Sequence, residues 1–310
     1  MATAQDLMKA QFARFAALDP QLPQDQFVPS DAEPVAARTA DGHAVAGLVT
    51  RTTNADGSAR GLWQAGEAFE LFPIVGEHPR GGMDSLLDAW RAWLGEQDDP
   101  GPNSSAMVVW PSRDVQATRA LLDHGFLPLS VLAVRSPTPV ADTELSGTVI
   151  VRRAGPADLD AVVELTLAEL EYAALVGTAT YRSDAAQLKR TAARVRLHSD
   201  DPVWLAEQDG TPVAVAECGW VDTGKPPRAY RLRPGSWAYV NCVSVHEKAR
   251  GTGVGQQLMA VAHNEFVRRG AEGSFLYYNP PNPLSSVFWP RQGYRPLWTM
   301  WEMRPATALR

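Results

Sequence analysis

Cysteine is scarce in this chain of 310 residues, and its six histidines form no cluster along the sequence. The two cysteines, Cys218 and Cys242, are not spaced as C-x-x-C. A disulfide framework and a zinc site are therefore not indicated, and we predict two buried free thiols and no metal site.

Long apolar runs are also missing. No stretch approaches the roughly 18 apolar residues that a membrane helix needs. Asp6, Lys9 and Arg14 interrupt the N-terminal segment, where a signal peptide would be apolar throughout. We therefore expect a cytoplasmic protein that does not contact membranes.

Positive charge is in deficit, with 29 basic against 35 acidic residues and a net charge of -6. The only lysines are Lys9, Lys189, Lys225 and Lys248. Because a duplex-binding protein usually carries a basic face, this balance predicts no nucleic-acid partner. The 45% of apolar residues is enough for a packed core and excludes wholesale disorder.

The length favours two domains at roughly 150 residues each. Residues 136–147 (SPTPVADTELSG) contain two prolines, small polar residues and no apolar periodicity, which is typical of an exposed linker. We therefore predict one domain over residues 1–135 and a second over residues 148–310.

The second domain alternates between strand and helix patterns. Apolar periodicity predicts strands at 148–153, 203–207, 212–221, 237–245, 274–278 and 294–303, and helices at 156–175, 183–197 with Ser183 as N-cap, 253–270 and 284–291. This order indicates an α/β fold, with a mixed sheet flanked by helices.

A glycine-rich loop lies between the strand at 237–245 and the next helix. Arg250, Gly253 and Gly255 give the pattern R-x-x-G-x-G. A loop that opens a helix presents unpaired N–H groups and the positive end of the helix dipole, which suits a phosphate or pyrophosphate. The dinucleotide pattern G-x-G-x-x-G and the ATP pattern G-x-x-x-x-G-K both fail at Gln256.

This loop resembles the acetyl-CoA loop of the GNAT superfamily of N-acetyltransferases. The pattern that usually ends such domains also follows in register, at Asn282, Ser285, Phe288, Trp289, Gly293 and Tyr294. The resemblance implies a GNAT fold and acetyl-CoA as co-substrate. It implies further that the pantetheine arm pairs with the backbone of Val243 and Val245 and lies near Asn279 and Asn282. The pyrophosphate is then bound by the backbone of Arg250, Gly251, Thr252, Gly253, Val254, Gly255 and Gln256.

Acetylation of an amine requires a base that removes the ammonium proton and a donor that stabilises the oxyanion, which the Val243 amide would provide. Glu217 is the first candidate base, because it is the only acid in an apolar strand, and a buried carboxylate suits this role. Tyr239, where many family members have a carboxylate, is the second. Turn formation and solvent exposure are the plainer explanations for Asn279, Asn282 and Glu217.

The family often protonates the leaving thiolate with a tyrosine, and here that position holds Trp289, whose indole cannot act as an acid. The alternatives are a hydroxyl of Ser285, Ser286 or Tyr278, a thiolate that leaves unaided, or impaired activity.

Residues 1–135 repeat this plan in degenerate form. Strand patterns at 44–51, 68–75 and 106–110 alternate with helix patterns, and Gly125-Phe126 resembles the family's terminal pair. Aligning Arg80 with Arg250 replaces Gly253 by Met83 and the next two positions by Asp84 and Ser85. The lost glycines and the charge of Asp84 predict weaker binding of a pyrophosphate and a domain that does not turn over. The sequence does not determine whether this domain binds CoA. Its first helix, 4–18, is expected to pack in the core or between domains.

The sequence thus predicts two tandem GNAT-like domains, each a mixed, mostly antiparallel sheet flanked by helices. The predicted function is acetyl-CoA-dependent N-acetylation of a small-molecule amine in the C-terminal domain. The alternative is a non-catalytic acyl-CoA-binding or regulatory module. No motif indicates the acceptor, the acyl length or the oligomeric state.

Overall fold

The computed structural model of the chain describes residues 3–24, 29, 31–55, 57–140, 149–224 and 231–309. Its strands are β1 (Glu33–Arg38), β2 (Ala44–Thr53), β3 (Glu67–Ile74), β4 (Ser104–Pro111), β5 (Leu127–Arg135), β6 (Val149–Arg153), β7 (Val203–Gln208), β8 (Thr211–Asp222), β9 (Ser236–Val245), β10 (Gly273–Tyr278) and β11 (Arg295–Met303). Its α-helices are α1 (Ala4–Leu18), α2 (Pro79–Glu96), α3 (Val115–Asp123), α4 (Leu159–Leu175), α5 (Ala185–Leu197), α6 (Val254–Arg268) and α7 (Ser285–Arg291). The expected α/β class is confirmed.

Local sequence explains where the helices begin. Thr3 and Asp6 form a capping box that starts α1 at Ala4, as the periodicity predicts. α5 begins two residues later than expected, and its N-cap is Asp184 rather than Ser183.

Two strands, β1 and β5, were not expected, because neither has a clear alternation of apolar and polar residues. None of the described helices combines the length and apolar character required to cross a bilayer.

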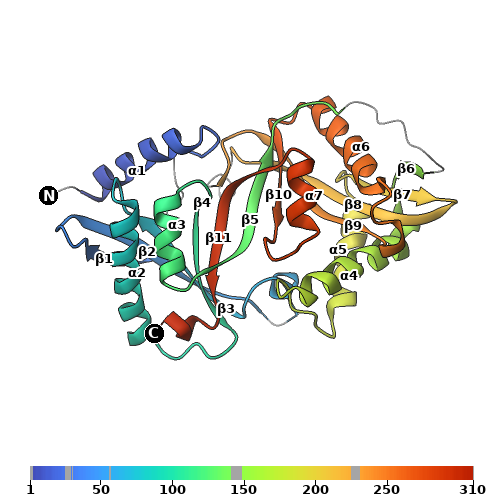
Figure 1. Ribbon diagram of the computed structural model, residues 1–310. Helices are drawn as coiled ribbons and strands as arrows, with labels where there is room; N and C mark the ends of the chain where they lie inside the picture. Colours follow the sequence, from blue (N-terminus) through green and yellow to red (C-terminus); the bar gives the residue numbers. More distant parts are fainter. Residues whose placement is uncertain are drawn as a thin grey trace.

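All eleven strands form one sheet, in the order β1-β2-β3-β4-β11-β5-β10-β9-β8-β7-β6. The pairs β3–β4 and β9–β10 are parallel and the other pairs are antiparallel. Helices cover the sheet, as Figure 1 shows. The two predicted sheets are therefore joined edge to edge as one mixed, mostly antiparallel sheet.

The last strands of the two halves are exchanged. We call residues 3–135 the N-terminal half and residues 149–309 the C-terminal half. β11 pairs with β4 of the N-terminal half, whereas β5 pairs with β10 of the C-terminal half and with β11. In Figure 1, β11 lies between β4 and β5. Each half is therefore completed by a strand of the other. The division at 136–147 stays a prediction, and residues 141–148 lie outside the described residues.

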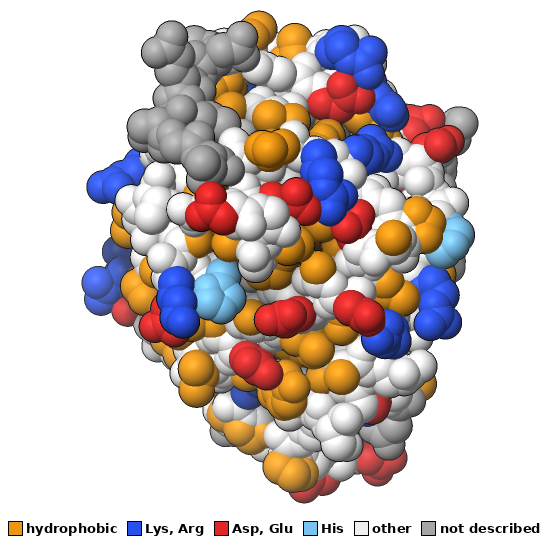
Figure 2. Space-filling view, turned by 90° about the vertical axis from the view of Figure 1, so that its right-hand side faces the viewer, with side chains coloured by type: hydrophobic (Ala, Val, Ile, Leu, Met, Phe, Trp, Pro, Cys, Tyr) orange, Lys and Arg blue, Asp and Glu red, His pale blue; other side chains and the backbone are white. Residues whose placement is uncertain are grey.

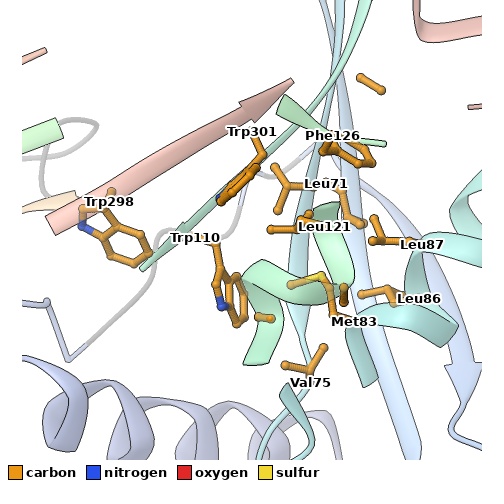
Figure 3. Packing of buried hydrophobic residues seen from close by; sticks show 14 of the residues in the cluster. Leu71, Val75, Met83, Leu86, Leu87, Trp110, Leu121, Phe126, Trp298 and Trp301 are labelled. Atoms are coloured by element: carbon orange, nitrogen blue, oxygen red, sulfur yellow. The ribbon is translucent and has the colours of Figure 1, made fainter. Parts of the chain in front are cut away.

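The largest apolar cluster also crosses between the halves. Trp298 and Trp301 of β11 are buried with Trp110 of β4 and Phe126. Figure 3 shows these side chains with Leu71 and Leu121 of the N-terminal half. Burial of apolar surface stabilises a fold by about 25 cal/mol per Å². The burial of Trp298 and Trp301 therefore stabilises the packing of β11 against the N-terminal half.

We expect Trp298→Phe to lower the free energy of unfolding by about 1–2 kcal/mol, because it removes buried volume and one hydrogen bond. The Trp298 Nε1–H donates to the Arg231 carbonyl oxygen at 2.8 Å. Trp220→Phe is the control, since its buried Nε1 has no hydrogen-bond partner among the described residues. Urea unfolding measures both. An equal loss in the two variants would contradict a role for this bond.

Charges of both signs are interspersed on the face of the molecule that lies to the right in Figure 1. Figure 2 shows acidic and basic side chains side by side there, with apolar side chains between them. Among the described side chains of this face, no extended area has one charge sign.

Candidate active site

A cavity of about 560 Å³ lies where β9 and β10 part. The two strands pair in parallel only from Trp237 and Gly273 to Val240 and Leu276. Beyond that point residues 241–245 and 277–278 diverge and line the cavity, together with the start of α6 and with α7. An opened parallel pair leaves backbone N–H and C=O groups available to an extended ligand that contains amides.

Ten of the eleven residues predicted to bind the co-substrate line this cavity. They are Val243, Val245, Arg250, Gly251, Gly253, Val254, Gly255, Gln256, Asn279 and Asn282. Thr252 is the exception, and its hydroxyl donates to the Ala249 carbonyl oxygen at 2.7 Å. The tertiary structure thus brings together segments that are about 40 residues apart in sequence.

The loop before α6 depends on two of its glycines. Gly253 is the N-cap of α6 and adopts a φ of 89°, which disfavours residues with a Cβ atom. A Cβ at Gly255 would lie 3.3 Å from Val245 Cγ2 and 3.5 Å from Phe288 Cε2, so the helix start packs closely against β9 and α7. The amides of Arg250 and Gln256 already donate to Glu247 and Gly253, which leaves the amides between them for an anion.

Both predicted asparagines hold the turn after β10. The Asn279 side-chain amide donates to the Leu129 carbonyl oxygen of the exchanged strand β5 at 3.0 Å. Asn282 Oδ1 accepts from the Leu284 and Ser285 amides at 3.0 and 3.2 Å. The turn that forms this side of the cavity is therefore fixed partly by the other half of the chain.

Glu169 of α4 is a cavity-lining carboxylate that the sequence analysis missed. Its Oε2 lies 3.7 Å from Lys189 Nζ, and the Cys242 thiol lies 3.9 Å away. Burial raises the pKa of Glu169, the nearby Lys189 ammonium lowers it, and the charge of Glu217 raises it again, with a net increase. A signal was present, because Glu169 shares the heptad spacing of the buried residues Val162, Thr166 and Ala173.

The predicted bases Glu217 and Tyr239 are not among the described residues that line the cavity. Glu217 is 5% exposed, accepts from Asn241 Nδ2 at 3.1 Å and lies 4.0 Å from Arg196 Nε. Tyr239 stacks on Phe275 with ring centroids 4.8 Å apart. Burial raises the pKa of Tyr239 far above neutral pH, so its phenol keeps its proton.

Three residues bear on protonation of a leaving group. Trp289 is buried and packs edge-on against Tyr294. The Ser285 hydroxyl lines the cavity, where it donates to the carbonyl oxygens of Asn279 and Asn282. Tyr278 also lines the cavity, and burial raises its pKa, so it enters a reaction at neutral pH with its proton in place.

The N-terminal half reaches the wall of the site through Trp63. Lys189, which pairs with Glu169, places its Nζ 5.6 Å from the centre of the Trp63 ring. The adjacent Leu62 accepts a hydrogen bond from the Thr180 amide and packs against Leu170 and Ala185. The position of the Lys189 ammonium therefore depends on both halves.

The segment 171–183 and the loop 222–235 make different contacts. Tyr172, in the segment 171–183, lines the cavity, and the guanidinium of Arg250 lies 5.4 Å from the centre of its ring. In the loop 222–235, Arg231 pairs with Glu70 of β3 at 2.8 Å. Lys225 and Arg228 lie outside the described residues.

The cysteines are as predicted, whereas two histidines that form no cluster along the sequence lie together in the structure. Both cysteines are buried and free, as predicted. His43 and His78, distant in sequence, stack with ring centroids 4.0 Å apart, and Asp41 lies beside them. Asp41 Oδ2 lies 3.3 Å from His43 Nε2, and these three side chains offer ligand atoms that could hold a metal ion, which the sequence did not indicate.

Comparison with known proteins agrees with this geometry. Residues 162–294 match the model of the acetyltransferase (GNAT) family. None of the curated proteins matches the chain in sequence. A GCN5-related N-acetyltransferase from Sphaerobacter thermophilus has a similar structure, with a TM-score of 0.59 and 16% identity over 98% of this chain and 95% of that chain. Another from Ralstonia eutropha JMP134 has 22% identity over 48% of this chain and 93% of that chain, with a TM-score of 0.39. The first match extends the fold to both halves.

Proposed function

Because residues 162–294 belong to the acetyltransferase (GNAT) family, we propose that this chain transfers an acetyl group from acetyl-CoA to the amine of a small molecule. The observation that carries the proposal is the opening between β9 and β10, whose cavity extends from the glycine loop to Glu169. Such a cavity accommodates an extended thioester with its phosphates at one end and an amine at the other.

The chain binds acetyl-CoA chiefly through its backbone. The amides of Gly251 to Gly255, at the positive end of α6, bind the pyrophosphate. Val243 and Val245 pair with the amides of the pantetheine arm in the manner of an added strand. The thioester then lies at the point where β9 and β10 separate, close to Glu169 and Tyr278.

Glu169 is the proton acceptor in this proposal, in place of Glu217. Its raised pKa makes it a stronger base than an exposed carboxylate, and it lines the cavity, whereas Glu217 bonds to Asn241 behind it. The neutral amine attacks the thioester carbonyl, the Val243 amide stabilises the oxyanion, and the carbon–sulfur bond breaks. Tyr278 donates its proton to the leaving thiolate, and the second proton of the amine, which the nitrogen loses as the amide forms, passes through water to Tyr278. Glu169 releases the first proton to solvent.

The acceptor in this proposal is a cation before it reacts. Glu169 and Glu217 lie close enough for their charges to interact, and Tyr172 lines the same cavity. The Arg250 guanidinium already lies over the Tyr172 ring and Lys189 pairs with Glu169, so the attraction for an ammonium group comes from the two carboxylates together rather than from the ring. The N-terminal half shapes this end of the site through Trp63 and Lys189.

Release of free CoA from acetyl-CoA, measured with and without a panel of small primary amines, tests the proposal. We expect release that depends on the amine and forms one acetylated product per CoA. Binding of acetyl-CoA without release above background, for every amine, would instead identify a non-catalytic acyl-CoA-binding module.

A further inference from the structure

The N-terminal half contains a second opening of the same kind. β3 and β4 are parallel, like β9 and β10, and pair only as far as Leu71 and Val108. We call the space beyond these two residues the N-terminal groove. When Arg80 is aligned with Arg250, Leu71 falls one position after Val240, the last paired residue of β9. The two halves therefore separate at nearly the same point.

Helix α1 fills the N-terminal groove with an amide. Gln11 is 1% exposed, and its Nε2 donates to the Pro73 carbonyl oxygen at 3.0 Å. The Val75 amide donates to Gln11 Oε1 at 2.8 Å. In the alignment, Pro73 and Val75 correspond to Val243 and Val245, the residues to which we assign the pantetheine arm. One carboxamide thus satisfies the backbone groups that a bound amide arm would use.

Neighbouring contacts hold α1 in this position. Arg14 donates to the Gly76 carbonyl oxygen at 3.1 Å and pairs with Asp114 before α3. Phe15 packs edge-on against Trp110 of β4, with ring centroids 5.2 Å apart. Figure 3 shows Trp110, Met83 and Val75 pointing into the same core, and each is buried. The N-terminal groove is therefore closed by packed side chains.

The start of α2 is also unlike the start of α6. α2 begins at Pro79, five residues before Asp84, which aligns with Val254. The Gly82 amide already donates to the His78 carbonyl oxygen within this first turn. The Asp84 carboxylate lies 3.5 Å from His124 Nε2. Because α2 begins five aligned positions earlier than α6, the N-terminal half lacks the loop to which we assign anion binding. It also lacks the glycines of that loop.

We propose that α1 is an internal ligand of the N-terminal half, in which the Gln11 carboxamide occupies the place of a pantetheine amide. The N-terminal half therefore presents no second acyl-CoA site, and the chain binds one acyl-CoA. Its groove has become a docking site for a segment of the same chain.

Hydrogen exchange in the full chain tests the docking directly. Gln11→Leu leaves the Pro73 carbonyl and the Val75 amide without partners, so amide exchange in residues 74–76 and in α1 should accelerate by roughly fivefold or more. Gln5→Leu is the matched control, because Gln5 is exposed on the same helix and should leave exchange unchanged. If Gln11→Leu does not fold, Gln11→Glu keeps an acceptor for Val75 but places a buried carboxylate oxygen against the Pro73 carbonyl oxygen, and α1 should still exchange faster. Unchanged exchange in both Gln11 variants would overturn the proposal.

Native mass spectrometry with acetyl-CoA tests the consequence. Gly253→Asp weakens the C-terminal loop, so at an acetyl-CoA concentration near the wild-type Kd a chain whose N-terminal groove is closed should bind almost none. A second molecule bound to the wild-type chain at saturation would show an open N-terminal groove and overturn the inference. If the wild-type chain binds none, the proposed function fails, while the exchange experiment still decides the docking of α1.

Discussion

Gly253→Asp is expected to weaken acetyl-CoA binding by roughly a hundredfold or more. A Cβ atom at a φ of 89° costs about 1–2 kcal/mol, and the loop relieves this strain by turning its amides away from the ligand. The new carboxylate adds repulsion of about 1 kcal/mol or more against the pyrophosphate, and each 1.4 kcal/mol is tenfold in affinity. Isothermal titration calorimetry with acetyl-CoA measures the loss.

Gly253→Ala separates the two causes, because it introduces the strain without the charge. There is open space around a Cβ at this position, so steric conflict with neighbours is not expected. We expect Gly253→Ala to bind roughly tenfold more tightly than Gly253→Asp. Wild-type affinity in Gly253→Asp would show that the pyrophosphate is not bound at the start of α6.

Glu169→Gln is expected to lower kcat by roughly 10² to 10⁴, the usual contribution of a general base. Glutamine has nearly the same shape but cannot accept the ammonium proton. The affinity for acetyl-CoA should be unchanged, because Glu169 faces the amine. Steady-state kinetics at saturating amine, with direct binding of acetyl-CoA, separate these two quantities.

The matched variant is Glu217→Gln, which removes a charge without removing the proposed base. Since the Glu217 charge raises the pKa of Glu169, its loss should lower that pKa. The base then stays ionised to lower pH, so the acid limb of the pH–rate profile should move to lower pH while the plateau is kept. If Glu217→Gln loses the plateau and Glu169→Gln keeps it, the base is Glu217, as the sequence alone predicts.

The C-terminal half could be predicted closely from its sequence. Its cofactor loop follows from the spacing of Arg250, Gly253 and Gly255, because a positive φ at Gly253 and close packing at Gly255 restrict these two positions to glycine. α1 was predicted residue for residue from its apolar periodicity, and the capping box of Thr3 and Asp6 fixes its first residue. Features that depend on a few contiguous residues could therefore be predicted from the sequence.

The proposed base was harder to predict from the sequence, because the burial of a side chain depends on the tertiary structure. Glu217 was preferred from its apolar surroundings in one strand, but Glu169 lines the cavity because α4 packs over β9. The charge that tunes Glu169 comes from Lys189 on α5, and Lys189 in turn rests on Trp63 of the other half. The spacing within α4 places Glu169 on the buried face of the helix, but it does not encode the contacts with Lys189 and Trp63.

The sequence by itself determined the α/β class, most of the helices and strands, and the glycine loop, because periodicity, caps and glycine conformations act over a few residues. Only the tertiary structure decided which strands pair. β5 and β11 have similar apolar faces, and their exchange depends on long-range packing, as in the burial of Trp298 and Trp301 among residues of the N-terminal half. The same long-range packing placed Glu169 at the cavity and Gln11 in the N-terminal groove.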